Sequence, residues 1–390
     1  MPYKYVILGA GRQGVAIAYD LAKNCEAASV ALADISRETA ENAVARLTRL
    51  LPSTMCKFIA LGCDVSNRQD AINAMKGADV VISAVPYRFN VELTDAAIAA
   101  GASFCDLGGN TGIVREQLRR DKAAVTAGVS IIPDCGLAPG LGNNLAAHGV
   151  ESLDDPEHVH IRCGGLPEKP VGPLGYKILF NIEGLINEYS GHGEFIRDGK
   201  LAEVRTLTEL EQIEFPPPVG ICEAAVTSGG TSTCPDTYLG RLRSYDYKTI
   251  RYPGHFAIMR ALMELGFLRD EAKLHDGTII KPGAICRQLL EDRLDFPDVR
   301  DIVLLRVTVV GFHGGKPRTL RYDLYDRHDE KTGFTAMERT TGFPTSLVAY
   351  MQARGLTTAG ARPLEVAVPA RQFFDELPQH EIHVKLDVGD

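Results

Sequence analysis

Short apolar runs alternate with helical stretches along the first third of the chain. The runs lie at residues 5–8, 29–33, 57–61, 79–84, 103–107 and 129–133, and segments with helical spacing separate most of them. The fourth run, Asp79-Val-Val-Ile-Ser-Ala84, is almost continuously apolar, which is typical of a strand buried on both faces. Strands that alternate with helices predict a parallel, doubly wound sheet. We therefore expect an α/β domain over residues 1–138.

The pattern changes after residue 139. Longer strand-like segments lie at 158–163, 221–227, 244–250, 302–310 and 319–325, with helical stretches at 176–189, 255–268 and 283–294. This arrangement predicts a second, mixed-sheet α+β domain over residues 139–340, which would serve for substrate binding or oligomerisation. We expect a last helix, around 345–354, to return to the first domain, so residues 341–365 are assigned to that domain.

The first apolar run leads directly into a glycine motif, Gly9-x-Gly11-x-x-Gly14, and a helical pattern follows. Gly9 suits a tight turn, Gly11 lets the backbone approach a pyrophosphate, and Gly14 lets the helix pack closely on the strand. The helix N-terminus then offers free N–H groups to that anion. Asp34 ends the second run twenty residues after Gly14, where an acid contacts the ribose hydroxyls of NAD. The motif predicts a dinucleotide-binding Rossmann domain.

Coenzyme contacts are expected in this glycine loop and just after the strands, because such sheets bind ligands outside the carboxyl ends of their strands. The predicted contacts are Gly9, Gly11, Arg12, Gln13, Gly14, Asp34, Asp64, Ala84, Pro86, Tyr87 and Gly108. Asp34 would repel a 2′-phosphate, which favours NAD, whereas Arg37 could accept one. We expect NAD, with NADP as the alternative.

Composition and charge argue against several other classes of protein. The net charge of −8 disfavours nucleic-acid or anionic-membrane partners, since both favour basic patches. No apolar run is long enough to span a bilayer, and no signal-peptide pattern precedes the first strand. Nine cysteines without a C-x-x-C pair indicate reduced thiols, so we expect a cytoplasmic protein. His158-x-His160 has no third ligand at a recognisable spacing, and no metal site is predicted.

Five segments together resemble the saccharopine dehydrogenase-like reductases. They are the glycine loop, Asp134-Cys-Gly-Leu-Ala-Pro-Gly140, Gly164-Gly-Leu-Pro167, Ser228-Gly-Gly-Thr-Ser-Thr233 and Tyr247-Lys-Thr-Ile-Arg-Tyr-Pro-Gly-His255. The second segment is shared across that family, whereas the last two are more similar to lysine 6-dehydrogenase. The resemblance implies NAD(P)-dependent oxidation of an amine on an amino acid. Arg12-Gln13 and Cys234-Pro235-Asp236 depart from the pattern, which leaves the exact substrate open.

Oxidation of an amine requires a proton acceptor, because a lysine ammonium, with a pKa near ~10.4, must lose a proton before it can release hydride. Asp134, after the sixth strand, is the first candidate; alternatively it caps the following helix. Asp106 is the second candidate, and its alternative role is to anchor the loop at Gly108-Gly109. His255 begins a helix and could relay a proton, contact a ligand or be structural.

Four residues are candidates for substrate binding besides His255. Arg251 ends a strand beside His255 and could bind a carboxylate. Thr231 lies in a glycine-rich turn that either approaches the ligand or is a plain tight turn. Asn181 and Glu183 lie on a predicted helix, where Glu183 could hold an ammonium group or be a solvated acid.

The leading hypothesis is an NAD-dependent oxidoreductase that acts on the 6-amino group of L-lysine and yields 2-aminoadipate 6-semialdehyde and ammonia. The first alternative is a saccharopine- or carboxynorspermidine-type reductase, which condenses an aldehyde with an amine and needs more arginines in its site. Arg88, Arg162 and Arg243 are available for that. The second alternative is a non-catalytic NAD(P)-binding regulator. We expect a small-molecule substrate, and a homo-oligomer because the large second sheet could form a subunit interface.

Overall fold

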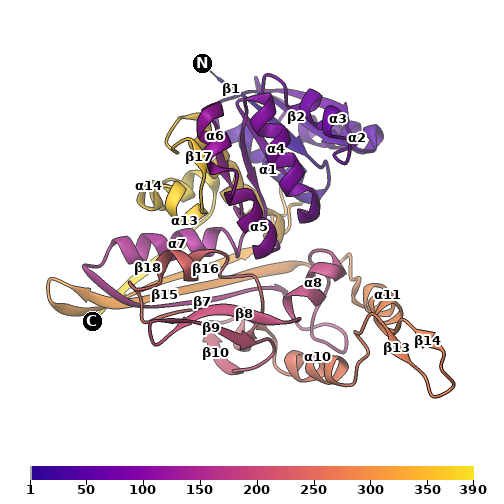
Figure 1. Ribbon diagram of the computed structural model, residues 1–390, viewed down its shortest axis with the longest axis vertical. Coiled ribbons are helices and arrows are strands. Elements are labelled where there is room, and N and C mark those ends of the chain that lie inside the picture. The colour runs from indigo at the N-terminus through magenta and orange to yellow at the C-terminus, as the bar shows by residue number, and fades with distance from the viewer. Residues whose placement is uncertain (1) are drawn as a thin grey trace.

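Seven parallel strands form the sheet of the first domain in the computed structural model, which describes residues 2–390 (Figure 1). They are β1 (Tyr3–Leu8), β2 (Ala27–Asp34), β3 (Lys57–Gly62), β4 (Val80–Ser83), β5 (Ser103–Asp106), β6 (Ser130–Ile132) and β17 (Gly360–Ala361). Their order is β3-β2-β1-β4-β5-β6-β17, so the sheet grows from β1 in both directions. The predicted doubly wound parallel sheet is confirmed. Ligands of such sheets bind where the strand order reverses, at the carboxyl ends of β1 and β4.

Helices cover both faces of this sheet. Those of the first domain are α1 (Arg12–Asn24), α2 (Arg37–Leu50), α3 (Arg68–Met75), α4 (Asn90–Ala100), α5 (Thr111–Leu118) and α6 (Asp121–Ala127), with a 3-10 turn η1 (Tyr87–Phe89). Ile7 of β1 packs on the side of α1 and α2, whereas Leu8 packs on the side of α3 and α4. The alternation follows from the two-residue period of a strand. The helix-like stretch between the fifth and sixth strands is two helices, α5 and α6.

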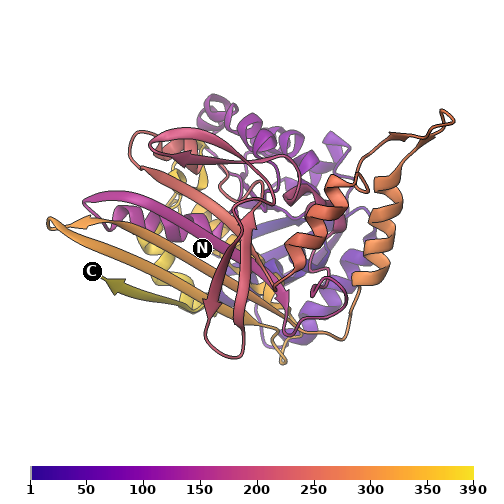
Figure 2. The same cartoon turned by 90° about the horizontal axis from the view of Figure 1, so that it is seen from below.

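The second domain is built on a mixed sheet, as predicted. Its main path runs β10 (Glu211–Phe215), β11 (Gly220–Val226), β12 (Ser244–Arg251), β7 (Asp155–Pro167), β15 (Asp301–His313), β16 (Lys316–Arg327) and β18 (Val384–Gly389). β12 and β7 are parallel, and the other neighbours on this path are antiparallel. β8 (His192–Arg197) pairs with β12 and with β9 (Lys200–Arg205). Viewed from below, these strands form the near face of the molecule (Figure 2).

Short helices and one projecting hairpin surround this sheet. They are α7 (Leu141–Glu151), α8 (Ile182–Glu188), α9 (Cys234–Tyr238), α10 (His255–Glu264) and α11 (Pro282–Leu294), with the hairpin β13 (Ala272–Lys273) and β14 (Ile279–Ile280). The hairpin extends away from the body of the molecule (Figure 2). The expected helix at 176–189 is wrong in its first half. The helix begins at Ile182 because the Asn181 side chain accepts a hydrogen bond from the Gly184 N–H and caps it there.

The chain returns to the first domain earlier than expected and adds more than a helix. α12 (Ala336–Ala353) begins at a capping box in which Thr335 and Glu338 exchange hydrogen bonds. Gly342 lets α12 approach α1 closely, since a Cβ there would lie 3.1 Å from that of Ala16. The elements after α12 are β17, α13 (Leu364–Ala367), α14 (Ala370–Glu376), a 3-10 turn η2 (Leu377–His380) and β18. The segment therefore contributes the edge strand of one sheet and the edge strand of the other.

One apolar core joins the two domains. It includes Ile7 of β1, Leu145 of α7, Val307 of β15 and Leu347 of α12. α7 lies between the two sheets (Figure 1). The shared core fixes the carboxyl ends of the first sheet above the second domain. Among the helices of residues 2–390, none has both the length and the apolar content of a membrane span.

Candidate active site

The three glycines of the first loop meet the steric demands of a coenzyme cradle. Gly9 has φ +97°, and a Cβ at this position would lie 2.8 Å from the Ala84 carbonyl oxygen. A Cβ at Gly14 would lie 1.9 Å from the Gly9 carbonyl oxygen, so only glycine lets α1 start so close to β1. Gly11 instead faces open space, with no atom within 4 Å of such a Cβ. The loop is therefore crowded at Gly9 and Gly14 and open at Gly11, which leaves space for a pyrophosphate at the start of α1.

Arg12 and Gln13 tie this loop to the returning segment. The Arg12 Nε donates to Glu338 at 2.6 Å, and the Gln13 Nε2 donates to the Met337 carbonyl oxygen at 3.3 Å. The Gln13 Oε1 is buried and accepts no hydrogen bond within residues 2–390. Both side chains therefore hold the α1 N-terminus against α12.

The acids after β2 and β3 shape loops at the same edge of the sheet. Asp34 accepts hydrogen bonds from the Ala10 and Ser36 N–H groups, at 2.9 and 3.0 Å. Asp64 accepts from the Ser66 N–H and hydroxyl groups, which lowers the pKa of its carboxyl. Asp34 thus lies against the glycine loop, and each of its carboxylate oxygens accepts one backbone N–H.

The residues after β4 connect the glycine loop to the loop after β5. Ala84 lies against Gly9, and Tyr87 lies against Gly109, where a Cβ would come within 2.9 Å of the ring. Gly108 in turn lies against Asp134, whose Oδ1 would be 1.9 Å from a Cβ at Gly108. Pro86 is exposed beside them. Coenzyme and acid candidates therefore converge at the carboxyl ends of neighbouring strands.

Asp134 is a buried carboxyl group held by one hydroxyl. Its φ is +61°, its Oδ2 accepts a hydrogen bond from the Ser232 hydroxyl, and its Oδ1 has no partner within the described chain. Burial, and next the negative charge of Asp106, raise the pKa of Asp134 to about 7, although the Ser232 hydroxyl and the nearby Gly109 N–H oppose the shift. It does not cap the next helix, because the N-cap of α7 is Gly140, whose N–H donates to the Asn143 side chain. Asp134 thus has the placement and the pKa of a group that exchanges protons near neutral pH.

Both carboxylate oxygens of Asp106 accept hydrogen bonds within the protein. Its Oδ1 accepts from the Gly108 and Asp134 N–H groups at 2.8 and 3.2 Å, and its Oδ2 accepts from the Gln117 Nε2 at 2.7 Å. Burial raises the pKa of its carboxyl. These contacts match the loop-anchoring alternative, and they also fix the backbone of Asp134.

A cavity of about 180 Å³ opens between the two domains beside these loops. Residues 109–112 of the first domain form one wall, and the second domain supplies Asn187, His192, Glu194, Ser228, Gly229 and Thr231. Thr231 precedes Ser232, the hydrogen-bond partner of Asp134, so the turn that lines this cavity is joined to the Asp134 carboxylate. Of the predicted substrate residues, Thr231 is the one that lines it.

Arg251 and His255 form a closed network apart from the cavity lining. The Arg251 Nε donates to the Tyr189 hydroxyl at 2.9 Å, and that hydroxyl lies 2.9 Å from His255 Nε2. The His255 Nδ1 lies 3.0 Å from the Leu174 carbonyl oxygen and must donate to it, so Nε2 accepts from Tyr189. Burial and the Arg251 charge lower the pKa of His255 to about 3. His255 is therefore a neutral, doubly bonded ring, which matches its structural alternative.

Arg251 also reaches toward the cavity through Glu188. Its guanidinium donates to the half-buried Glu188 carboxylate at 3.3 Å, and Glu188 is next to the cavity-lining Asn187. Asn181 and Glu183, at the start of α8, are exposed and do not line the cavity. The sequence reading missed Ser232, Glu194 and Arg115, whose importance depends on contacts between distant segments.

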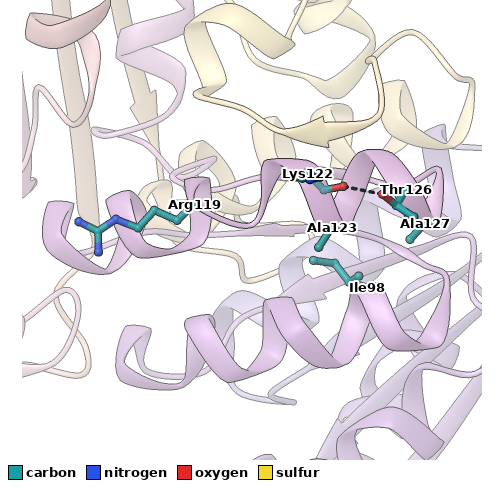
Figure 3. Close-up of a pocket in the computed structure, with 6 residues that line it drawn as sticks. All are labelled: Ile98, Arg119, Lys122, Ala123, Thr126 and Ala127. Carbon is teal, nitrogen blue, oxygen red and sulfur yellow. Dashed lines mark hydrogen bonds between the residues drawn. The ribbon is translucent and has the colours of Figure 1, made fainter.

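Two other features lie away from this site. A hollow of about 590 Å³ between α4 and α6 is lined by Ile98, Arg119, Lys122, Ala123, Thr126 and Ala127 (Figure 3). It lies near the helix ends that lead into β5 and β6, opposite the carboxyl ends of the strands. Asp20, Cys25 and His380 are grouped closely enough to share an ion, but His380 Nδ1 already binds Asp20 at 2.6 Å.

Comparison with known families accounts for nearly the whole chain. Residues 5–132 match the saccharopine dehydrogenase NADP binding domain, and residues 136–382 match the saccharopine dehydrogenase C-terminal domain. The chain belongs to the saccharopine dehydrogenase family. The glycine cradle, open at Gly11, fits the nicotinamide dinucleotide that this family domain binds.

Individual relatives are distant. Saccharopine dehydrogenase [NADP(+), L-glutamate-forming] of Schizosaccharomyces pombe is 25% identical over 224 residues, which cover 55% of this chain and 49% of the relative. Carboxynorspermidine synthase of Vibrio alginolyticus is 24% identical over 298 residues, 71% of this chain and 70% of the relative. Apo saccharopine dehydrogenase (L-Glu forming) of Saccharomyces cerevisiae superposes with a TM-score of 0.79 at 20% identity, with full coverage of both chains. The chain spans about half the length of the first curated relatives, and the structural likeness shows the fold.

Proposed function

We propose that this protein is a nicotinamide-dinucleotide-dependent oxidoreductase that oxidises the carbon bearing a primary amine, with the 6-amino group of L-lysine as leading substrate. The observation that carries the proposal is Asp134, a buried carboxyl group with one oxygen free of hydrogen bonds, joined through Ser232 to the turn that lines the interdomain cavity. Its pKa of about 7 lets it accept a proton at neutral pH and release it again.

The chain's own residues supply proton transfer and orientation. When bound, the nicotinamide supplies hydride acceptance. Asp134 takes the proton that a substrate ammonium must lose, and Ser232 holds the carboxylate by donating to its Oδ2. Asp106 fixes the Asp134 backbone through the 3.2 Å bond to its N–H. Water then hydrolyses the substrate imine to an aldehyde and ammonia.

NAD is the proposed coenzyme, although residues 5–132 match an NADP binding domain and the Schizosaccharomyces pombe relative is an NADP(+) enzyme. Asp34 lies against the glycine loop, where its carboxylate would repel a 2′-phosphate. Arg37, the residue that could accept that phosphate, is paired with Glu41 at 3.0 Å. A kcat/KM for NAD⁺ at least about tenfold above that for NADP⁺ is expected.

A second candidate is reductive condensation of an aldehyde with an amine, which the likeness to carboxynorspermidine synthase supports. That chemistry requires additional charged contacts for the second reactant. Arg162 is bound by Asp246 and Glu211 in the second sheet, and Arg243 pairs with Glu157. Neither of these arginines lines the interdomain cavity, and Arg88 does not line it either, which favours the dehydrogenase hypothesis.

The test is a pair of assays on the purified chain. L-lysine with NAD⁺ at mildly alkaline pH should produce reduced coenzyme and an equal amount of ammonia. Faster turnover of an aldehyde with glutamate or a diamine than with ammonia would favour the condensing reductase. Tight coenzyme binding with neither amine oxidation nor reductive condensation would support the hypothesis of a non-catalytic regulator.

A further inference from the structure

One wall of the interdomain cavity carries an ion-paired group. Glu194 of β8 lines the cavity, and Arg115 of α5 donates to its two oxygens at 3.2 and 2.5 Å. The same guanidinium donates to Asp236 of α9 at 3.0 Å. α5 lies at the underside of the first domain, on the side of the second domain (Figure 1). The ion-paired group therefore joins the two domains beside the cavity. Two carboxylates share one guanidinium, which leaves one uncompensated negative charge.

The rest of the cavity lining does not neutralise that charge with a lysine or arginine. Apart from Glu194 and His192, the lining consists of glycines and neutral polar residues. A carboxylate offers about four acceptor positions on its two oxygens, so Glu194 can bind a ligand while Arg115 orients it. The Glu194 side chain is 40% exposed, which leaves it open to a ligand. Such a wall attracts a cationic group and repels an additional carboxylate.

The Glu194 wall and Asp134 are held by adjacent residues of one turn. The Thr231 hydroxyl donates to the Glu194 main-chain oxygen at 2.9 Å, and the Ser232 hydroxyl donates to the Asp134 carboxylate. Because consecutive Cα atoms lie about 3.8 Å apart, this turn joins the main chain at Glu194, which lines the cavity, to the Asp134 carboxylate. The acids differ in environment: Asp134 is fully buried, whereas Glu194 is paired and partly open.

We propose that Glu194, oriented by Arg115, binds the non-reacting ammonium group of a substrate that carries two amino groups. This inference rests on the proposed function and narrows its substrate class to diamino compounds. Asp134 deprotonates the amine that is oxidised, and Glu194 holds the second amine in its charged form. An acid pair of this kind selects substrates by the presence of the second ammonium, and disfavours substrates that present another carboxylate there.

The experiment compares the variant Glu194→Gln with the wild type in the presence of saturating coenzyme. L-lysine and 6-aminohexanoate share the 6-amino and carboxylate groups, but only lysine has the second amine. We expect the kcat/KM for L-lysine divided by that for 6-aminohexanoate to fall about tenfold or more in Glu194→Gln, because a hydrogen bond to a charged group is lost. Glu116→Gln is the matched control, since Glu116 follows Arg115 on α5 but pairs with Arg119 and Arg120 and does not line the cavity. Its ratio should change less than threefold.

Binding is measured separately from turnover by titrating 1,5-diaminopentane into the protein–coenzyme complex in a calorimeter. Weaker binding to Glu194→Gln, at unchanged melting temperature and coenzyme affinity, supports the proposal. An unchanged lysine ratio together with unchanged diamine binding would overturn it. Failure of the proposed function looks different: the wild type would bind the diamine in a Glu194-dependent way and oxidise no amine.

Discussion

Asp134 and Asp106 are neighbouring buried acids with different hydrogen-bond partners. Asp106 is saturated by two N–H groups and an amide, which suits a permanent structural contact. Asp134 has one hydroxyl partner and a free oxygen, which suits reversible protonation. Where two neighbouring carboxyl groups have different environments, their pKa values differ, and this difference commonly identifies the one that takes part in acid–base chemistry.

Replacement of Asp134 by asparagine should therefore abolish proton transfer with little loss of structure. We expect kcat for amine oxidation to fall by about 10²–10⁴ in Asp134→Asn. The wild-type rate should rise with pH through about 7, as Asp134 loses its proton, and this step should vanish in the variant. Rates across pH 5–10 check both points. The control is Asp95→Asn, because Asp95 is an acid on α4 that pairs with Arg120. A wild-type-like pH step in Asp134→Asn would assign the titration to another group.

Ser232 should set the position of that pH step. Its hydroxyl donates to the Asp134 carboxylate and so lowers the pKa of Asp134 relative to burial alone. Loss of the hydroxyl in Ser232→Ala removes a stabiliser of the charged form, so the step should move to higher pH. Ser190→Ala, whose hydroxyl donates to the Ile186 carbonyl instead, should leave it in place. A shift of the step to lower pH in Ser232→Ala would show that the hydroxyl does not favour the carboxylate.

At the scale of elements, the sequence predicted features whose cause is local. The glycine loop could be predicted because the steric requirement at each glycine arises within one strand–turn–helix unit. The start of α12 also has a local sequence signal, the Thr335-x-x-Glu338 capping box, although the helix was expected only around 345–354. The wall formed by Arg115, Glu194 and Asp236 was not, because its members are 79 and 121 residues apart and meet only in the folded chain.

The glycine loop allows stability and coenzyme binding to be separated. Gly14→Ala would place a Cβ 1.9 Å from the Gly9 carbonyl oxygen, so it should destabilise the fold by about 1–3 kcal/mol or more. Gly11→Ala meets no atom within 4 Å and has an ordinary φ of −74°, so its melting temperature should stay close to wild type. It should nonetheless bind coenzyme about tenfold more weakly, because the methyl group occupies the pyrophosphate approach. Thermal melts and coenzyme titrations check the pair; full coenzyme affinity in a stable Gly11→Ala would contradict the cradle.

At the scale of the whole molecule, the returning segment connects everything that the active site needs. Through α12 it holds the α1 N-terminus by Arg12 and Gln13, and through α13 it reaches the turn that carries Ser232. Glu365 of α13 is 6% exposed and accepts hydrogen bonds from the Thr233 and Thr237 hydroxyls. No cation pairs with it in residues 2–390.

Burial of Glu365 without a cation predicts a pH-dependent contribution to stability. Burial raises the pKa of Glu365 above that of an unfolded glutamate, near ~4.3, so the native state retains the proton to higher pH than the unfolded state. By linkage, this group's contribution is most favourable below ~4.3 and declines as pH rises toward its folded pKa. Glu365→Gln keeps an oxygen acceptor for the two threonines and cannot ionise. Its melting temperature relative to wild type should therefore increase from pH 5 to pH 8, by roughly 1–3 °C. Glu376→Gln, which loses a 2.6 Å pair with Arg354 on the same segment, should instead melt below wild type. A Glu365→Gln profile parallel to wild type at every pH would mean that Glu365 carries the same charge in both states.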